Sequence, residues 1–179
     1  LSSYQLTLMT LASVAGTMSN SRFITTAGAP SDGGLRRMYS DTTAFTFPVG
    51  SGANYTPATV HVRKIPDLYG SVAVTPVPVR HPFTTNATCL PYYWKVVESD
   101  FSGIKDSSVR LIFNYGILTD NVAYVPGKYN PVAWKYINNV ALVDETANLI
   151  RFPAENSFEG EYTAGIPAAF DTLVAFYSR

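Results

Sequence analysis

The sequence predicts an all-β protein with an antiparallel β-sandwich fold of Greek-key or jelly-roll type, and three observations support this. Short segments repeatedly alternate apolar and polar residues with a period of two, which is typical of half-buried strands. The chain is rich in Tyr (12) and Phe (10), which suit a pleated, half-buried surface. Its 12 Gly and 12 Pro are spread along the chain as turn signals, and no window combines helical periodicity with helix caps.

The length of 179 residues fits one domain with a substantial core. Charged residues make up 15% of the chain, below the roughly 25% of ordinary soluble domains. Because the chain begins and ends within apparent strands, we expect residues 1–179 to form a single β-sandwich module excised from a longer polypeptide. Residues 1–26 are expected either to be N-terminal linking strands, added to a neighbour, or to end a β-solenoid.

Alternation and intervening turn residues predict the strands of the first part of the chain. They lie at residues 4–11, 19–24, 35–39, 43–47 and 58–63. In the last of these, Val60 and Val62 share one face, and His61 and Arg63 share the other. His61 is therefore expected on the polar face of its strand.

A Gly/Pro corner follows the strand at residues 43–47. Phe45 and Phe47 share one face of that strand and are expected in the core. Pro48 and Gly50 are predicted to end it, and residues 54–56 to form an exposed loop.

Proline limits what the segment at residues 71–79 can be. Pro76 and Pro78 interrupt its valines, and proline cannot donate to a central ladder. We therefore predict an edge strand or an extended crossing. Further single strands are predicted at residues 92–97, 108–115 and 171–177. Residues 131–137, 139–143 and 148–152 are predicted to form a three-stranded meander.

Several functions are disfavoured by composition and motifs. The 13 basic and 13 acidic residues balance, whereas nucleic-acid binding needs a clustered basic face. No apolar run reaches the roughly 18 residues of a membrane span. No facing carboxylate pair, catalytic triad, phosphate loop or metal-ligand spacing is recognisable. Cys89 has no nucleophile context that would pair it with His61 or His81. We expect no enzyme, catalytic residue, metal or other cofactor.

The two tryptophans have different expected roles. Trp94 shares a strand face with Tyr92 and Val96 and is predicted to be a central core residue, whereas Lys95 is predicted on the opposite face. Trp134 is the better ligand candidate, because an exposed aromatic pair with Tyr136 or Tyr129 could stack on a sugar ring. A position in the core or at a module interface is nevertheless the favoured interpretation for Trp134.

Several segments resemble one protein family. The sequence SDTTAFTFPVG at residues 40–50, followed by NYTPATV at 54–60, resembles a signature of very large secreted surface proteins of Bacteroidetes. Segments at residues 92–96, 158–165 and 174–179 fit the same family in the same order. The resemblance implies a repeated β-sandwich module, exported by type IX secretion and similar to adhesins, without catalytic residues. It also implies O-glycosylation at Thr42 and Thr172.

The functional expectation follows from this resemblance. We expect a structural or adhesive module of an extracellular, cell-surface or filament-forming protein. Its expected partners are neighbouring modules or identical subunits, joined through terminal strands, and surface glycans. The alternative is a carbohydrate-binding module of a secreted multidomain enzyme.

Overall fold

The computed structural model describes residues 4–29, 31–85, 88–116 and 122–170. Within these residues the fold is all-β, with no α-helix and two short 3-10 helices, η1 (Val140–Leu142) and η2 (Pro167–Ala169). The predicted fold class is confirmed. None of the described helices has the length and apolarity that crossing a bilayer requires.

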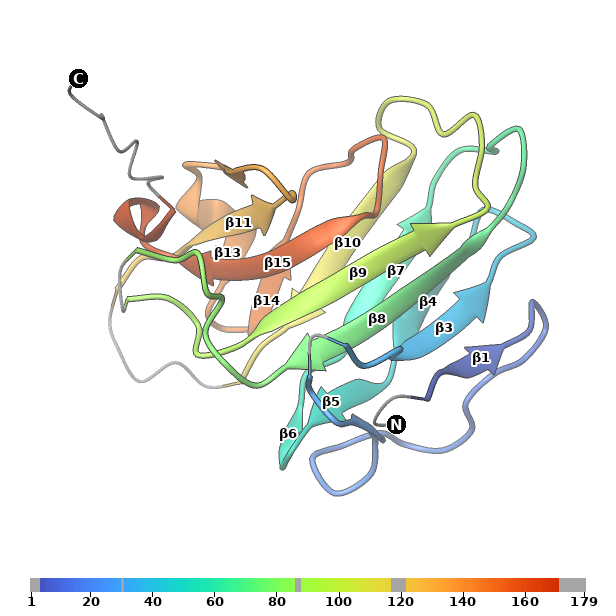
Figure 1. Ribbon diagram of the computed structural model, residues 1–179, viewed down its shortest axis with the longest axis horizontal. Helices are drawn as coiled ribbons and strands as arrows, with labels where there is room; N and C mark the ends of the chain where they lie inside the picture. The colour runs from blue at the N-terminus through green and yellow to red at the C-terminus, as the bar shows by residue number, and fades with distance from the viewer. Residues whose placement is uncertain (1–3, 30, 86–87, 117–121, 171–179) are drawn as a thin grey trace.

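A seven-stranded sheet forms the front layer of the molecule in Figure 1. Its strands are, in spatial order, β1 (Leu6–Leu8), β3 (Leu35–Met38), β8 (Ser71–Val77), β9 (Tyr93–Ser99), β15 (Gly160–Gly165), β11 (Val125–Tyr129) and β12 (Trp134–Tyr136). Neighbours pair antiparallel except β1 and β3, which are parallel.

A five-stranded antiparallel sheet lies behind it (Figure 1). Its strands are β13 (Val143–Asp144), β14 (Leu149–Arg151), β10 (Val109–Asn114), β7 (Ala58–Val62) and β4 (Ala44–Phe47). A small third sheet contains β2 (Ile24–Thr26), β5 (Val49–Ser51) and β6 (Asn54–Tyr55).

The core lies between the two larger sheets. Trp94 of β9 is fully buried, and its ring lies 4.7 Å from that of Phe113 on β10. Its indole Nε1–H donates to the Thr56 carbonyl at 2.9 Å, which removes the cost of burying that donor. The prediction that Trp94 is a core residue is confirmed. Val60 and Val62, which the alternation places on one face, are buried in the same core.

The predicted corner after Phe47 is in part a strand. Pro48 ends β4, but the chain continues directly as β5, whose three residues are buried. β5 pairs with β2 in parallel and with β6 in a hairpin. Gly50 does not end a strand: a Cβ there would lie 2.1 Å from the Asn54 carbonyl oxygen, so the hairpin needs glycine at this position.

The expectation that residues 71–79 form an edge strand is wrong. β8 is central and pairs with both β3 and β9. β3, however, pairs only as far as Val74, so Pro76 lies beyond its end. Proline has no backbone N–H to donate. Because β3 does not extend to Pro76, the pairing of β3 with β8 does not need a hydrogen bond from that residue.

The predicted meander at residues 131–152 is also not formed. β12 pairs with β11 in the large sheet, whereas β13 and β14 belong to the five-stranded sheet, with η1 between the two groups. Local turn residues cannot distinguish pairing within one sheet from a crossing between two. The predicted strand at residues 171–177 lies outside the described residues.

Candidate functional site

The candidate site lies on the outer face of the large sheet, and strand register assembles it. Trp94 faces the core, so its neighbour Lys95 points outward. Lys95 is paired with Glu161 of β15, Glu161 with Tyr129 of β11, and Tyr129 with Trp134 of β12. These four residues form a continuous row across four strands, although they are far apart in the sequence.

The loop between β8 and β9 covers part of this row with His81. The His81 side chain is only 1% exposed. Its ring lies 4.8 Å from Tyr93, 4.9 Å from Tyr129 and 4.7 Å from Trp134, measured between centroids. The histidine thus fills the space between the loop and the aromatic part of the sheet.

Hydrogen bonds determine which tautomer of His81 is present. The backbone N–H of Phe83 donates to Nδ1 at 3.2 Å, so Nδ1 is an acceptor and the ring proton is on Nε2. Nε2 lies 2.6 Å from Oε2 of Glu161 and donates to it. This tautomer is uncharged. Because the Glu161 side chain is 27% exposed, its carboxylate is both anchored and accessible.

Phe83 is an exposed aromatic residue on a fixed backbone. Its N–H is bound by His81, and its carbonyl accepts the Trp134 indole N–H at 2.8 Å. The ring is 57% exposed and stacks on Tyr129 with centroids 4.9 Å apart and planes at 26°. A large exposed aromatic ring with so little freedom is preorganised for binding.

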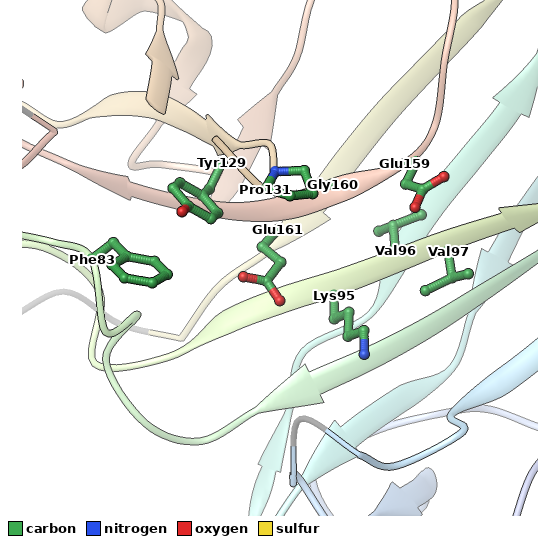
Figure 2. A pocket seen from close by; sticks show the side chains of 9 residues that line it. All are labelled: Phe83, Lys95, Val96, Val97, Tyr129, Pro131, Glu159, Gly160 and Glu161. Carbon is green, nitrogen blue, oxygen red and sulfur yellow. The ribbon is translucent and has the colours of Figure 1, made fainter. Parts of the chain in front are cut away.

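These residues border an open pocket of about 360 Å³, shown in Figure 2. Ligand pockets in proteins typically measure about 300–1,000 Å³. In the figure, the rings of Phe83 and Tyr129 lie on one side, and Glu161 points into the space between them and Lys95. The remaining lining comes from Val96, Val97, Pro131, Glu159 and Gly160.

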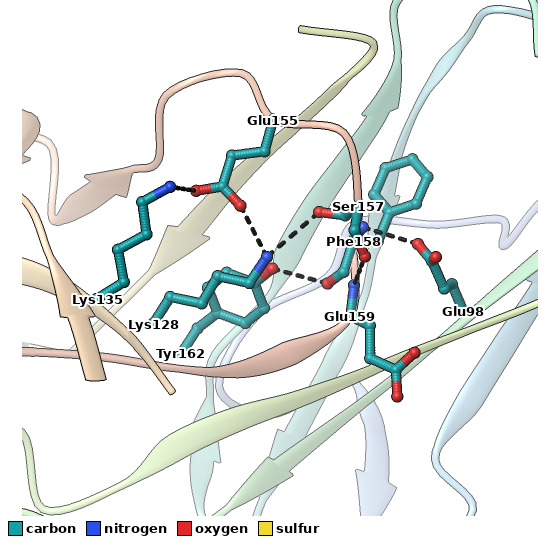
Figure 3. A network of polar contacts seen from close by, with 8 residues as sticks. All are labelled: Glu98, Lys128, Lys135, Glu155, Ser157, Phe158, Glu159 and Tyr162. Carbon is teal, nitrogen blue, oxygen red and sulfur yellow. Dashed lines mark hydrogen bonds and ion pairs between the residues drawn. The ribbon is translucent and has the colours of Figure 1, made fainter. Parts of the chain in front are cut away.

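A polar network holds the segment that leads to Glu159 and Gly160 (Figure 3). The Lys128 ammonium donates to Glu155 at 2.8 Å and to the Ser157 carbonyl at 3.4 Å. Tyr162 donates its hydroxyl to the Phe158 carbonyl at 2.7 Å. These contacts fix the segment before β15, so the rim of the pocket is held by one buried and two partly buried hydrogen bonds.

The predicted ligand residues are brought together only in part. Tyr129 and Trp134 lie beside each other, with centroids 5.3 Å apart, but their planes are inclined by 59°. Trp134 uses its indole N–H on Phe83. Tyr136 stacks on Phe170 instead, with centroids 5.8 Å apart, and is not part of the pocket lining.

Sequence reasoning did not identify Phe83, Lys95 or Glu161 as site residues. Phe83 lies in a loop, where no periodicity applies. Lys95 was predicted on the face of its strand opposite Trp94, which is correct, but nothing local indicates that β15 lies beside β9. The signal that could have found Glu161 is its alternation with the aromatic Tyr162, which places an acidic residue on the outer face of the strand.

The structure also shows where the other residues considered from the sequence lie. Within the described residues, no group of three or more His, Cys, Asp or Glu side chains could hold a metal ion. Cys89 is a buried thiol. Thr42 is exposed at the turn before β4, and Thr172 lies outside the described residues.

Comparison with known proteins adds no further assignment, because no protein-family model, curated protein or solved structure matches this chain.

Proposed function

We propose that this chain is a structural and adhesive module of a secreted bacterial surface protein, without enzymatic activity. The resemblance of residues 40–60 to surface-protein modules supports the class. The observation that carries the structural part is the edge of the large sheet at β1. A carbohydrate-binding module of a secreted enzyme is the second candidate, favoured by the Phe83–Tyr129 stack.

The β1 edge exposes apolar side chains beside unpaired backbone. β1 pairs with β3 on one side over three residues, and no described strand pairs with its other side. The segment around it exposes large apolar side chains: Tyr4, Leu6, Met9 and Leu11, the last 95% exposed. Exposed apolar groups on an open strand edge favour pairing with another chain.

Arg37 holds the segment that follows β1. Its guanidinium donates to the carbonyls of Ala12 at 2.7 Å and Thr10 at 3.1 Å and lies 4.2 Å from the centroid of the Phe45 ring. The occupant that we propose for the open edge of β1 in an assembly is residues 4–12 of a neighbouring copy, added as a further strand. This pairing would cover the exposed apolar side chains and give the unpaired backbone groups of β1 partners.

The test is to delete residues 1–13 and measure melting temperature and oligomeric state against the full chain, using light scattering over a range of concentrations. We expect the full chain to associate as concentration rises, and the truncated chain to be monomeric and less stable. Leu11→Ser in the full chain changes one exposed contact and should weaken association without lowering the melting temperature. Unchanged melting and association after the deletion would refute the proposal.

A further inference from the structure

We propose that the pocket between Phe83, Tyr129, Glu161 and Lys95 binds a neutral hexopyranose unit of a glycan. This inference rests on the adhesive part of the proposed function and names its ligand. It differs from the site expected from Trp134, Tyr136 and Tyr129, because its stacking surface is Phe83 and its polar contacts come from Glu161, Glu159 and Lys95.

The apolar side of the pocket fits the C–H face of a sugar ring. A pyranose ring presents several C–H groups on one face, and these carry partial positive charge. The face of an aromatic ring is negative, so the two attract. Phe83 offers such a face at the pocket wall, and its stacking on Tyr129 together with its bound backbone leaves little conformational entropy to lose on binding.

The polar side fits sugar hydroxyls, which both donate and accept hydrogen bonds. Glu161 accepts from hydroxyls, and its position is fixed by the hydrogen bond from His81. Lys95 lies on the other side of Glu161 from Phe83 in Figure 2, and its ammonium can donate to a sugar hydroxyl. Hydrogen bonds to charged partners are stronger than neutral ones, so a few such contacts orient a small ligand.

Charge selects among sugars and against other ligands. The pocket holds two carboxylates, Glu159 and Glu161, and one ammonium, Lys95. The excess of negative charge disfavours uronic and sialic acids. A neutral hexose does not meet this penalty. The volume of about 360 Å³ suits a mono- or disaccharide.

The test is an NMR titration of the full, ¹⁵N-labelled chain. The probes are methyl glycosides of glucose, galactose and mannose, with glucuronate as the anionic probe and Nα-acetyl-lysine amide as the cationic probe. We expect saturable shifts of the Phe83, Lys95 and Gly160 amides with at least one neutral glycoside at millimolar concentration. Binding of the lysine derivative alone, tighter binding of glucuronate, or no saturable shift with any neutral glycoside would each overturn the proposal.

Three variants and a control assign the effect to the pocket. Phe83→Ala should weaken binding at least about tenfold, equal to about 1.4 kcal/mol, whereas Phe83→Tyr should retain it. Glu161→Gln keeps an acceptor for His81 but removes the charge, so it should weaken neutral sugar binding and reduce discrimination against glucuronate. Ile65→Ala removes another exposed apolar side chain, 70% exposed and outside the pocket lining, and should bind as the parent does.

The sugar-binding proposal and the assembly proposal can fail independently of each other. Phe83→Ala should leave concentration-dependent association unchanged, and the deletion of residues 1–13 should leave sugar binding unchanged. Sugar binding without self-association would overturn only the proposal that copies pair through β1. Self-association without sugar binding would overturn only the pocket.

Discussion

Nε2 of His81 lies 2.6 Å from Oε2 of Glu161, joining a loop to a strand 80 residues further along the chain. The histidine is buried under aromatic rings, and its other nitrogen is occupied by the Phe83 N–H. This pair therefore links the loop conformation, the position of Phe83 and the charge in the pocket. Its disruption should affect both stability and the site.

Replacing His81 by alanine should destabilise the fold by about 2–4 kcal/mol, because it creates a cavity among the rings and leaves the Phe83 N–H without a partner. Urea denaturation followed by tryptophan fluorescence measures the change. The control is Arg80→Ala, at an exposed position in the same loop, which should stay within about 0.5 kcal/mol. Equal effects of the two substitutions would contradict this role of His81.

The two tryptophans should differ in their contribution to stability. Trp94→Phe removes buried volume and the hydrogen bond to the Thr56 carbonyl, and should cost about 2–3 kcal/mol. Trp134→Phe removes a hydrogen bond in a partly exposed cluster, and should cost about 1 kcal/mol. Chemical denaturation of both variants measures this difference. A larger loss for Trp134→Phe would place the energetic centre in the outer cluster.

The carboxylate of Glu155 contacts a buried and an exposed cation, which allows a matched comparison (Figure 3). The Lys128 side chain is 11% exposed and that of Lys135 is 68% exposed. Glu155→Gln leaves Lys128 charged without its anionic partner and should cost about 2–3 kcal/mol. Lys135→Gln breaks only an exposed pair and should cost less than about 0.5 kcal/mol. Thermal and urea unfolding of both variants test this, and similar losses would show that burial of Lys128 is unimportant.

Alkaline pH should destabilise the fold through its buried and partly buried tyrosines. Burial raises the pKa of Tyr92 from 10.0 to about 12 and also raises the pKa values of Tyr39 and Tyr162. Above pH 10 the unfolded chain loses a proton that the folded chain retains, so stability falls as pH rises. For Tyr92 the fall extends from the unfolded pKa to about pH 12, with a slope of up to about 1.4 kcal/mol per pH unit.

Tyr92→Phe isolates the contribution of one group. At neutral pH it should cost about 1 kcal/mol, because the Gly116 N–H donates to the Tyr92 hydroxyl at 2.9 Å. Above pH 10 its stability should fall less steeply than that of the parent. Urea midpoints measured at successive pH values give both effects, and parallel curves for the two proteins would exclude Tyr92 from the alkaline transition.

Local pattern determined much of the fold. The alternation of Val60 with His61 correctly assigned the faces of β7, and that of Trp94 with Lys95 correctly assigned those of β9. These assignments succeed because the side-chain period of a strand is fixed by its backbone geometry. The same reasoning failed for β8, because the role of Pro76 depends on where β3 ends.

Only the tertiary structure decided the site. Lys95, Glu161, Tyr129 and Trp134 form one row because β9, β15, β11 and β12 are neighbours, and pairing between distant strands has no local signal. The sequence by itself determined an all-β fold, a few core residues such as Trp94 and Phe47, and the placement of Lys95 on the strand face opposite Trp94. The order of the strands, and the loop that brings His81 and Phe83 over them, determined the pocket, because its contacts join residues that only folding brings together.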